Sequence, residues 1–499
     1  MASICTSNVT SGFIDLATFD ELEKYMYGGP DATAYFVRET RKATWFTQVP
    51  VVLSRASGTP AFDTEWSVSI SRAGDYLLAT WLRLTTPKIT LNVNATTQQP
   101  GSYVYAVRWT RNFMHNIIRE ACITFNDLVA ARFDCYHLDF WSAFTVPASK
   151  RNAYNNMIGN FPDMTDPQIE VTSPNPIIGA VIKSATLNLP LPFFYARDSG
   201  VALPTAALPY NDMRLNFSFR KWDELLIVDK FEQTTSPTTY KYVSSACATE
   251  GTIAGTIVGT PVLKDVQVWA NYAIVSNDER KRMACAPRDI LIEQVQTAPR
   301  QTFLPLTMPR FDIRFSHAIK VLFFSARNYT YPCSWSNYTA GQPLIACLVP
   351  SGSITQELVC TIDYSSDSMV DPILHTSLIY ENTNRLSLMG SDYFSLVNPW
   401  YTAPAIPLET GYHLYSYSLD FISLDPMGST NYGKLTNVSI VPESSQEAKN
   451  YSAAAVSPYI STDFEKAGVY IPQKWDFVVT AVNNNIVRIS GGALGFPVL

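Results

Sequence analysis

The sequence has few charged residues and few glycines for its length. Only 16% of the 499 residues are Asp, Glu, Lys or Arg, against about 25% in average soluble domains. The 22 glycines are outnumbered by 32 prolines, and 13% of the residues are aromatic. This composition favours β-structure over helices, and it predicts a surface that partners partly cover.

A basic surface and a membrane span are also missing. The formal net charge is −6 and no long run of Lys or Arg occurs, so we expect no direct contact with nucleic acid. The N-terminus, MASICTSNVTSGFIDLATFD, lacks the basic and apolar segments of a secretory signal. The apolar stretch YLLATWLRL at 76–84 is too short to cross a bilayer and contains Arg83. We therefore expect a soluble chain made in the cytosol.

No spacing typical of a metal, nucleotide or disulfide site is present. The five histidines show no H-x-x-x-H or HExxH pattern, so each is expected to be a hydrogen-bonded polar residue. GTIAGTIVGT at 251–260 lacks the Lys-Ser/Thr of a phosphate-binding loop. We predict no cofactor and no metal. The eight cysteines include no C-x-x-C pair, which favours free thiols; they are Cys5, Cys122, Cys135, Cys247, Cys285, Cys333, Cys347 and Cys360.

One stretch, LPLPFFYARDSGVALPTAALPY at 189–210, raises the question of a nucleophile because Ser199 follows Asp198. A serine nucleophile needs a base and an orienting acid, and the G-x-S-x-G turn is absent. We instead expect Arg197 and Asp198 to form a local ion pair or turn cap. The prediction is therefore that no residue is catalytic, although carboxylates that pair only through the fold would leave no spacing to recognise.

The same stretch has the composition of a structural corner. Gly200 is expected to give the turn its conformational freedom, and the prolines to fix φ around it. The rings of Phe193, Phe194 and Tyr195 are expected to fill one end of a barrel.

Alternating apolar and polar residues predict half-buried strands in WSVSISR (66–72), RLNFSFR (214–220) and LYSYSLDF (414–421). Helical patterns are few: 134–145, part of 147–158, and 276–285, where Ser276 and Glu279 have capping-box spacing. A similar spacing from Thr18 to Glu21 predicts a short helix through Met26 in an N-terminal arm, ended by Gly28-Gly29-Pro30. Many short strands without βαβ alternation predict two β-sandwiches joined by a polar helix.

Landmarks recur in the same order in the two halves, which predicts an internal repeat. Segment 134–185 has no short counterpart. In the proposed pairing, the corner at 189–210 corresponds to a segment without its Arg-Asp-Ser, so the corner and not a reactive group is repeated. The paired segments are 70–84 with 315–327, 124–133 with 379–388, 189–210 with 398–421, and 266–275 with 477–490.

Motifs along nearly the whole chain resemble the major capsid protein of iridoviruses, a branch of the nucleocytoplasmic large DNA viruses. Segments 222–264, 328–372 and 440–472 do not match. The motifs are SGFIDLATFD (11–20), YGGPDATAYF (27–36), RAGDYLL (72–78), RWTRNFMHN (108–116), YNNMIGN (154–160), RDSGVALPTAALPYND (197–212), RDILIEQVQTAP (288–299), DIRFSHAIKVLFF (312–324), IYENTNRL (379–386), YFSLVNPWYTAPAIPLETGYHLYSYSL (393–419) and GSTNYGKLTN (428–437).

The resemblance implies an all-β double jelly-roll, with two eight-stranded antiparallel sandwiches at 36–275 and 288–499, an arm at 1–35 and a helical linker at 276–287. It implies a structural protein, not an enzyme, that forms homotrimers with a pseudo-hexagonal outline. These capsomers would tile an icosahedral virion shell, assembled in the host cytoplasm. Neighbouring capsomers, minor capsid proteins and an internal viral membrane are the implied partners. The arm would lie on the inner side and the unmatched loops would point outward.

Three other functions remain open from the residues alone. A lectin-like or receptor-binding jelly-roll would bind glycans as a monomer or small oligomer. An enzyme would use Asp198 and Ser199, the only visible candidates. A capsid vertex protein would be a single jelly-roll in a pentamer, which the two-half organisation disfavours.

Overall fold

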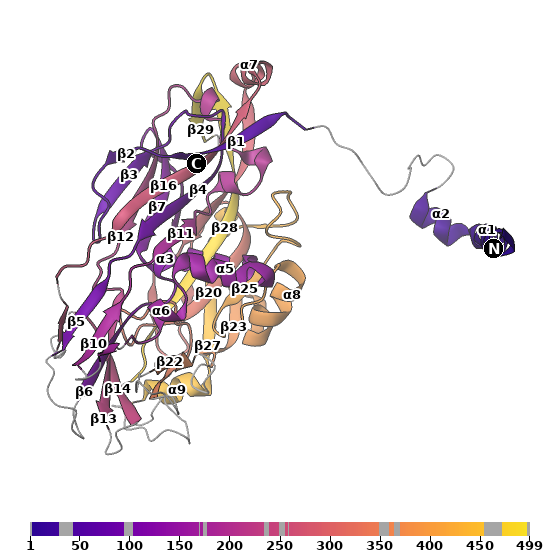
Figure 1. Ribbon diagram of the computed structural model, residues 1–499. Coiled ribbons are helices and arrows are strands. Elements are labelled where there is room, and N and C mark those ends of the chain that lie inside the picture. The colour runs from indigo at the N-terminus through magenta and orange to yellow at the C-terminus, as the bar shows by residue number, and fades with distance from the viewer. Residues whose placement is uncertain are drawn as a thin grey trace. The chain divides into compact units, whose positions relative to one another are not determined.

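The computed structural model describes residues 2–28, 43–93, 103–168, 170–172, 177–233, 239–248, 255–257, 259–348, 359–363, 370–453 and 472–496. The chain divides into two compact units, Met1–Trp45 and Phe46–Leu499. In the described part of the first unit the chain forms α1 (Ala2–Ala17) and α2 (Glu21–Tyr27), whereas the described strands lie in the second unit (Figure 1).

The short helix of the arm begins at a different cap from the one predicted. Asp20 is the N-cap of α2: its carboxylate accepts from Leu22 N at 3.1 Å, and Glu23 accepts from Asp20 N at 3.3 Å. The predicted cap, Thr18, donates its hydroxyl to Asp15 O in the last turn of α1 instead. Helix α1 was not predicted. The helix ends at Tyr27, one residue beyond the predicted end and directly before Gly28 at φ 92°.

The second unit contains two sandwiches with the same strand order, and we call them the first and second sandwich. In each, if eight strands are numbered along the chain, one sheet has the order 1-8-3-6 and the other 2-7-4-5. All pairs are antiparallel, which is the connectivity of a jelly-roll. The predicted fold class, an all-β double jelly-roll, is therefore confirmed.

In the first sandwich, one sheet contains β1 (Phe46–Val52), β16 (Lys264–Val275), β4 (Tyr76–Thr85) and β11 (Thr186–Pro190). The other sheet contains β3 (Glu65–Ser69), β12 (Met213–Phe219), β7 (Ile118–Phe125) and β8 (Leu128–Asp134). Strand β2 (Arg55–Ser57) extends this second sheet next to β3. The second sandwich uses β17 (Arg288–Thr297), β28 (Trp475–Ser490), β20 (Ala318–Asn328) and β25 (His413–Ser416), opposite β19 (Phe311–Asp312), β27 (Val438–Ser444), β23 (Ile373–Tyr380) and β24 (Thr383–Gly390).

Further strands extend one end of the molecule. The sheet β22-β21-β14-β13-β6 joins β6 (Tyr103–Trp109), β13 (Leu226–Gln233) and β14 (Thr239–Cys247) to β21 (Leu344–Leu348) and β22 (Val359–Asp363). A second sheet contains β15 (Gly255–Ile257), β5 (Ile89–Val93), β10 (Ile177–Ile182) and β9 (Glu170–Thr172). The unmatched segments 222–264 and 328–372 therefore pair with each other through β14 and β21.

The topology confirms most of the predicted repeat and corrects one pairing. Strands β4 and β20, the hairpins β7-β8 and β23-β24, and strands β16 and β28 hold equivalent places. The corner at 189–210, however, follows the sixth strand of the first sandwich, whereas 398–412 precedes the sixth strand of the second. The true counterpart of 398–412 lies in 135–185, because both connect the fifth strand to the sixth. The two loops have a similar content of proline and aromatic residues but occupy different positions in the strand order, so matching them by composition gave the wrong pair.

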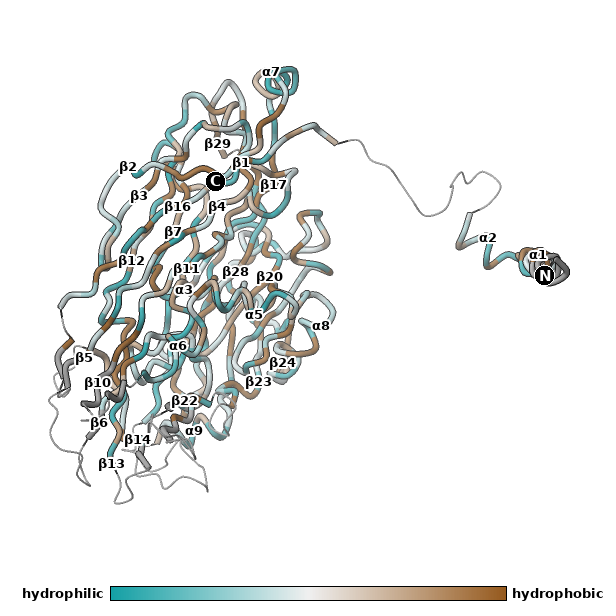
Figure 2. The backbone as a smooth tube through the Cα atoms, viewed as in Figure 1, coloured by the Kyte–Doolittle hydropathy of each residue, from teal (hydrophilic) through white to brown (hydrophobic). Residues whose placement is uncertain are grey.

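The predicted helices form where expected. They are α4 (Cys135–Thr145), α5 (Ala148–Ile158) and α7 (Asn277–Cys285). Helix α7 joins the sandwiches and is largely hydrophilic (Figure 2), although its N-cap, Ser276, makes no side-chain cap hydrogen bond.

The predicted alternation holds along one of the three strands, although the last predicted polar residue, Arg220, lies beyond the strand and is buried. In β12, Leu215, Phe217 and Phe219 are buried while the residues between them are half-buried. In β3 the intervening Ser67 is also buried, because its hydroxyl meets that of Ser57 on the neighbouring strand β2 at 2.7 Å. The third pattern is wrong beyond Ser416, where β25 ends and Leu419 becomes 79% exposed.

Candidate functional site

The Arg-Asp-Ser segment is a structural joint, but not in the predicted way. Ser199 is exposed, and Asp198 makes no side-chain cap. Arg197 does not pair with Asp198: its Nη2 lies 2.7 Å from Glu293 Oε2 on β17, and its guanidinium lies 3.7 Å from the ring centroid of Trp141. Burial lowers the pKa of Arg197 and the carboxylate of Glu293 opposes that shift. Arg197 therefore links the first sandwich to the second.

Of the remaining predictions for this corner, the one for the aromatic rings is confirmed and the one for Gly200 is wrong. Phe193, Phe194 and Tyr195 are buried as expected, and the Tyr195 hydroxyl lies 2.7 Å from Thr80 Oγ1. Gly200 is not among the glycines with positive φ. The prediction that this turn needs glycine's conformational freedom is therefore wrong.

An aromatic contact joins the two sandwiches. Phe140 and Phe144 of α4 stack on Phe323 of β20, with ring centroids 5.9 and 5.7 Å apart. Trp141 meets Phe421 edge-on at 5.8 Å. Helix α4, from the first sandwich, thus covers the outer face of sheet β17-β28-β20-β25. The inner face of that sheet packs in the second sandwich's own core.

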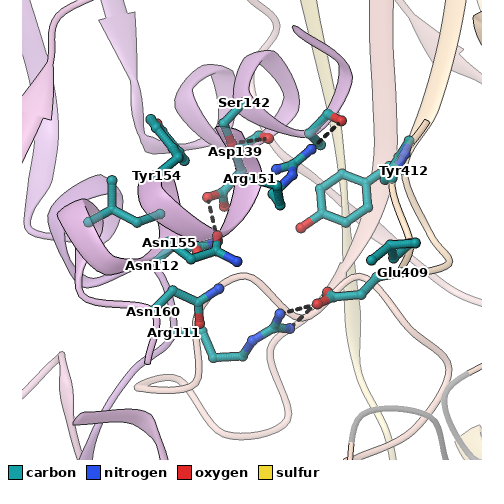
Figure 3. Close-up of a pocket in the computed structure, with 14 residues that line it drawn as sticks. Arg111, Asn112, Asp139, Ser142, Arg151, Tyr154, Asn155, Asn160, Glu409 and Tyr412 are labelled. Atoms are coloured by element: carbon teal, nitrogen blue, oxygen red, sulfur yellow. Dashed lines mark hydrogen bonds and ion pairs between the residues drawn. The ribbon is translucent and has the colours of Figure 1, made fainter. Parts of the chain in front are cut away.

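A buried carboxylate reinforces this contact (Figure 3). Asp139 of α4 accepts hydrogen bonds from four side chains on both sides of the joint. Asn112 Nδ2 at 3.2 Å and His115 Nδ1 at 2.8 Å come from the first sandwich, whereas the Ser336 and Tyr338 hydroxyls, both at 2.8 Å, follow β20. The four hydrogen bonds that the carboxylate accepts offset the free-energy cost of burying it.

A small pocket of about 100 Å³ lies beside Asp139. Arg111 forms a two-pronged ion pair with Glu409 across it, with one contact at 2.9 Å between Nη1 and Oε2. Arg151 Nη2 donates to the Ala143 carbonyl at 2.8 Å. Burial raises the pKa of Tyr412 well above its usual value, so its hydroxyl stays protonated. Arg111 and Arg151 are thus both engaged by groups of the protein, and the pocket is best described as a polar joint between the sandwiches.

The joint also contains a covalent link that the sequence did not indicate. Cys247, at the end of β14, and Cys333, after β20, form a disulfide with Cα atoms 5.5 Å apart. The expectation of free thiols is therefore wrong for these two residues, because the fold brings together cysteines 86 positions apart. The free cysteines among the described side chains are Cys122, Cys135 and Cys285. The side chains of Cys5, Cys347 and Cys360 lie outside the description.

The histidines follow the prediction only in part. His115 and His413 are hydrogen-bonded: His115 Nε2 lies 2.7 Å from the Tyr154 hydroxyl, and His413 Nε2 lies 2.7 Å from Asp371 Oδ2. His137 is buried with no hydrogen-bond partner for either ring nitrogen. Burial, with the charge of Arg197 adding to it, lowers its pKa to about 3. His137 therefore packs as a neutral aromatic ring.

The described part of the chain contains neither a metal-binding cluster nor a membrane-spanning helix. No group of three or more His, Cys, Asp or Glu there is placed to hold a metal ion. No described helix combines the length and apolar character needed to cross a membrane.

Two of the apolar surfaces of the described chain bear on how it packs against other molecules. The first, which we call the α8 face, surrounds α8 (Asn398–Thr402), at the right-hand edge of the β-rich unit in Figure 1, and its side chains are mostly exposed. An adjoining groove of about 600 Å³ lies between this segment and α5. The α8 face comprises Leu396, Val397, Trp400, Tyr401 and Leu408, exposed by 53, 44, 70, 79 and 98%.

The second, the tryptophan face, lies on sheet β1-β16-β4-β11 of the first sandwich. Trp81 and Trp269 are cross-strand partners whose rings stack with centroids 6.1 Å apart. Both are half-buried, whereas their neighbours Leu82 and Val268 point into the core. The topologically equivalent surface of the second sandwich is the one covered by α4.

The α8 face and the tryptophan face are apolar surfaces of the kind that packs against other molecules. Comparison with known proteins shows which class of protein has this fold. The family described as large eukaryotic DNA virus major capsid protein matches residues 279–495, and the family described as major capsid protein N-terminus matches residues 34–275. The chain belongs to the major capsid proteins of large eukaryotic DNA viruses. It is therefore a structural subunit of the virion capsid and not an enzyme.

The individual relatives place the resemblance among iridoviruses, as the motifs predicted. The chain is 61% identical to the major capsid protein of Costelytra zealandica iridescent virus, over 100% of both chains. It is 59% identical to that of Invertebrate iridescent virus 6 and 47% identical to that of Lymphocystis disease virus 1, again over 100% of both chains.

Solved structures share the fold at low sequence identity. The PBCV-1 virus capsid quasi-atomic model matches with a TM-score of 0.68 at 17% identity, covering 93% of this chain and 100% of that chain. The Faustovirus major capsid protein matches with a TM-score of 0.64 at 12% identity, covering 92% and 93%.

Proposed function

We propose that three copies of the chain associate into a pseudo-hexagonal capsomer and that these capsomers tile an icosahedral shell. The observation that carries this proposal is the inequality of the two sandwiches. The connection between strands five and six of the first sandwich, through α4, covers the outer sheet of the second. The same connection of the second sandwich carries the exposed α8 face, and the equivalent sheet of the first carries the half-exposed tryptophan face.

A head-to-tail arrangement removes this inequality. If the α8 face of one copy covers the tryptophan face of the next, every sandwich covers its neighbour in the same way. Six equivalent contacts close a ring, and six sandwiches are three chains. The apolar side chains of the α8 face suit a permanent contact, since such interfaces are richer in apolar area than transient ones.

The same proposal assigns the remaining segments. We place the sandwiches at 36–275 and 288–499, the linker at 276–287 and the arm at 1–35, on the inner side of the shell facing minor capsid proteins and an internal membrane. Segments 222–264 and 328–372 are proposed to point outward, supported by their pairing through β14 and β21. Much of the third segment, 440–472, lies outside the described residues. Synthesis and assembly are proposed to occur in the host cytoplasm.

Mass photometry of the purified chain tests the proposal. Wild type is expected at three times the monomer mass of 55.6 kDa, and Trp400→Asp is expected to shift the population to monomers because a charge would be buried in the contact. Leu306→Asp is the matched control, since Leu306 is 75% exposed and lies outside the α8 face. A monomeric wild type would overturn the trimer. A trimeric Trp400→Asp would overturn the assignment of the face.

A further inference from the structure

A second cavity lies between the two sandwiches and is lined by arginines from both. Its volume is about 560 Å³. Arg119 and Arg220 come from the first sandwich, and Arg300 and Arg327 from the second. Four arginines and two carboxylates, those of Glu224 and Asp476, line the cavity, which leaves a net charge of +2.

At the centre of this cluster, two guanidinium groups enclose one indole ring. The Cζ atoms of Arg220 and Arg327 each lie 3.6 Å from the ring centroid of Trp335. Two groups this close to one centroid must occupy opposite faces of the ring. The indole is fixed in place, because its Nε1 donates to the Glu224 carbonyl and its backbone N–H donates to Thr110 Oγ1, both at 2.9 Å.

Neither of these two buried cations has a carboxylate within ion-pair distance among the described residues, although Asp134 and Asp476 act on Arg220 and Arg327 from further away. Arg220 and Arg327 are only 8% and 3% exposed. Arg220 donates to the Asn116 carbonyl at 2.8 Å and to Cys135 Sγ. Arg327 donates to the Tyr136 hydroxyl at 3.1 Å and the Pro332 carbonyl at 3.2 Å, and its Nε has no hydrogen-bond partner. Buried charges without a counter-charge are costly.

The two carboxylates that line the cavity are already engaged at its more exposed side. Glu224 lies 3.4 Å from Arg119, which also lies 3.3 Å from Asp63. Asp476 lies 3.8 Å from Arg300. The side chains of Arg119 and Arg300 are 39% and 49% exposed, so the cavity is accessible from solvent past them. Arg220 and Arg327 are therefore the two arginines of this cavity for which the described residues provide no ion pair.

We propose that this cavity binds a tetrahedral oxyanion of the phosphate and sulfate class. Guanidinium groups match the geometry and charge of such ions, and arginines outnumber carboxylates in the lining of the cavity. An ion bound there would be held by arginines of both sandwiches and would add a non-covalent link beside the Cys247–Cys333 disulfide. The same chemistry is offered by free phosphate and by a phosphomonoester, and the experiment separates the two.

Isothermal titration calorimetry of the full chain in a chloride buffer tests this site, whatever the oligomeric state. Sodium phosphate is expected to give saturable heat with one site per chain, and sodium chloride at matched ionic strength to give none. Phenyl phosphate is titrated in parallel: binding no weaker than that of phosphate indicates a phosphomonoester, and weaker binding indicates the free ion. Phosphate should also raise Tm, because it binds only the folded chain.

The decisive variant is Arg300→Gln, whose half-exposed side chain leaves the buried cluster intact. It is expected to weaken phosphate binding by about tenfold, the effect of losing one charge-assisted hydrogen bond. Arg55→Gln, an exposed arginine on β2, should bind like wild type. Absence of saturable phosphate heat, an equal response to chloride, or unchanged affinity in Arg300→Gln would overturn the proposal. None of these outcomes depends on whether the chain forms trimers.

Discussion

The Tyr338 hydroxyl donates to Asp139 Oδ2 at 2.8 Å, and the two residues belong to different sandwiches. Asp139 lies on α4 of the first sandwich, whereas Tyr338 follows β20 of the second. Burial raises the pKa of Tyr338 well above its usual value and the charge of Asp139 adds to the shift, so the hydroxyl remains a donor. One carboxylate thus fixes how the two jelly-rolls meet, within a contact that is otherwise aromatic.

Replacing this carboxylate should loosen the joint. In Asp139→Asn an amide N–H₂ would face donors such as Ser336 and Tyr338, leaving some of them without an acceptor. We expect a loss of about 3 kcal/mol in the free energy of unfolding, measured by urea denaturation. Asp425→Asn is the control because Asp425 is exposed, and it should change stability by less than about 0.5 kcal/mol. A similar stability for both variants would show that the side-chain donors left without an acceptor in Asp139→Asn bind water instead, and it would contradict the prediction.

The disulfide gives a second, independent test of the joint. Cys247→Ser with Cys333→Ser removes a link that closes a loop across 86 positions. The double variant is expected to lose about 2–4 kcal/mol in the free energy of unfolding under oxidising conditions. Addition of a reductant should lower wild-type stability toward that of the variant. Cys285→Ser, at an exposed free thiol, is the control and should leave stability unchanged. Mass spectrometry of alkylated, unreduced protein checks the link directly: labelling of Cys247 would contradict it.

The sequence predicted the features that depend on neighbouring residues. Alternation in β12 and the helical pattern of α4 and α7 are local, and all three formed. The equivalence of β4 with β20 and of β16 with β28 followed from ordered apolar landmarks. Family motifs supplied the double jelly-roll, because a motif summarises long-range structure that composition does not reveal.

The features that were missed depend on contacts between distant segments. Arg197 finds Glu293 and not its neighbour Asp198, because only the fold brings β17 beside this corner. The partner of Cys247 likewise cannot be found without the fold, which places the loop that contains Cys333 next to it. The arginines around Trp335 come from segments more than a hundred residues apart, and no spacing rule connects them. A clue was available only for His137, whose neighbours in the helix sequence, CYHLDFW, are mostly apolar.

His137 predicts a pH dependence of stability. Its pKa is about 3 in the folded chain and 6.5 in the unfolded chain, so the unfolded state binds a proton first as pH falls. Its contribution to stability is complete above pH 6.5 and is lost between about pH 6.5 and 3, at about 1.4 kcal/mol per pH unit. In His137→Phe, which keeps an aromatic ring beside Phe133 and Phe323, this part of the loss should disappear. Urea denaturation at pH 7 and pH 5 measures the difference, and equal slopes in wild type and variant would refute it.

Gly411 tests whether a glycine is required where the two sandwiches meet. Its φ is 98°, a conformation that other residues rarely adopt, and a Cβ there would overlap the backbone carbonyl of Tyr338. Gly411→Ala is therefore expected to move Tyr338 away from Asp139 and to cost about 3 kcal/mol in the free energy of unfolding.

Gly200→Ala is the matched control, since the nearest atom to its added Cβ is the flexible Asp198 carboxylate at 3.1 Å and its φ is not positive. It should change stability by less than about 1 kcal/mol. Urea denaturation of both variants compares them. If Gly411→Ala were as stable as Gly200→Ala, the segment carrying Tyr338 would have to shift without cost, and the close packing of the two jelly-rolls around Asp139 would not be what holds them together.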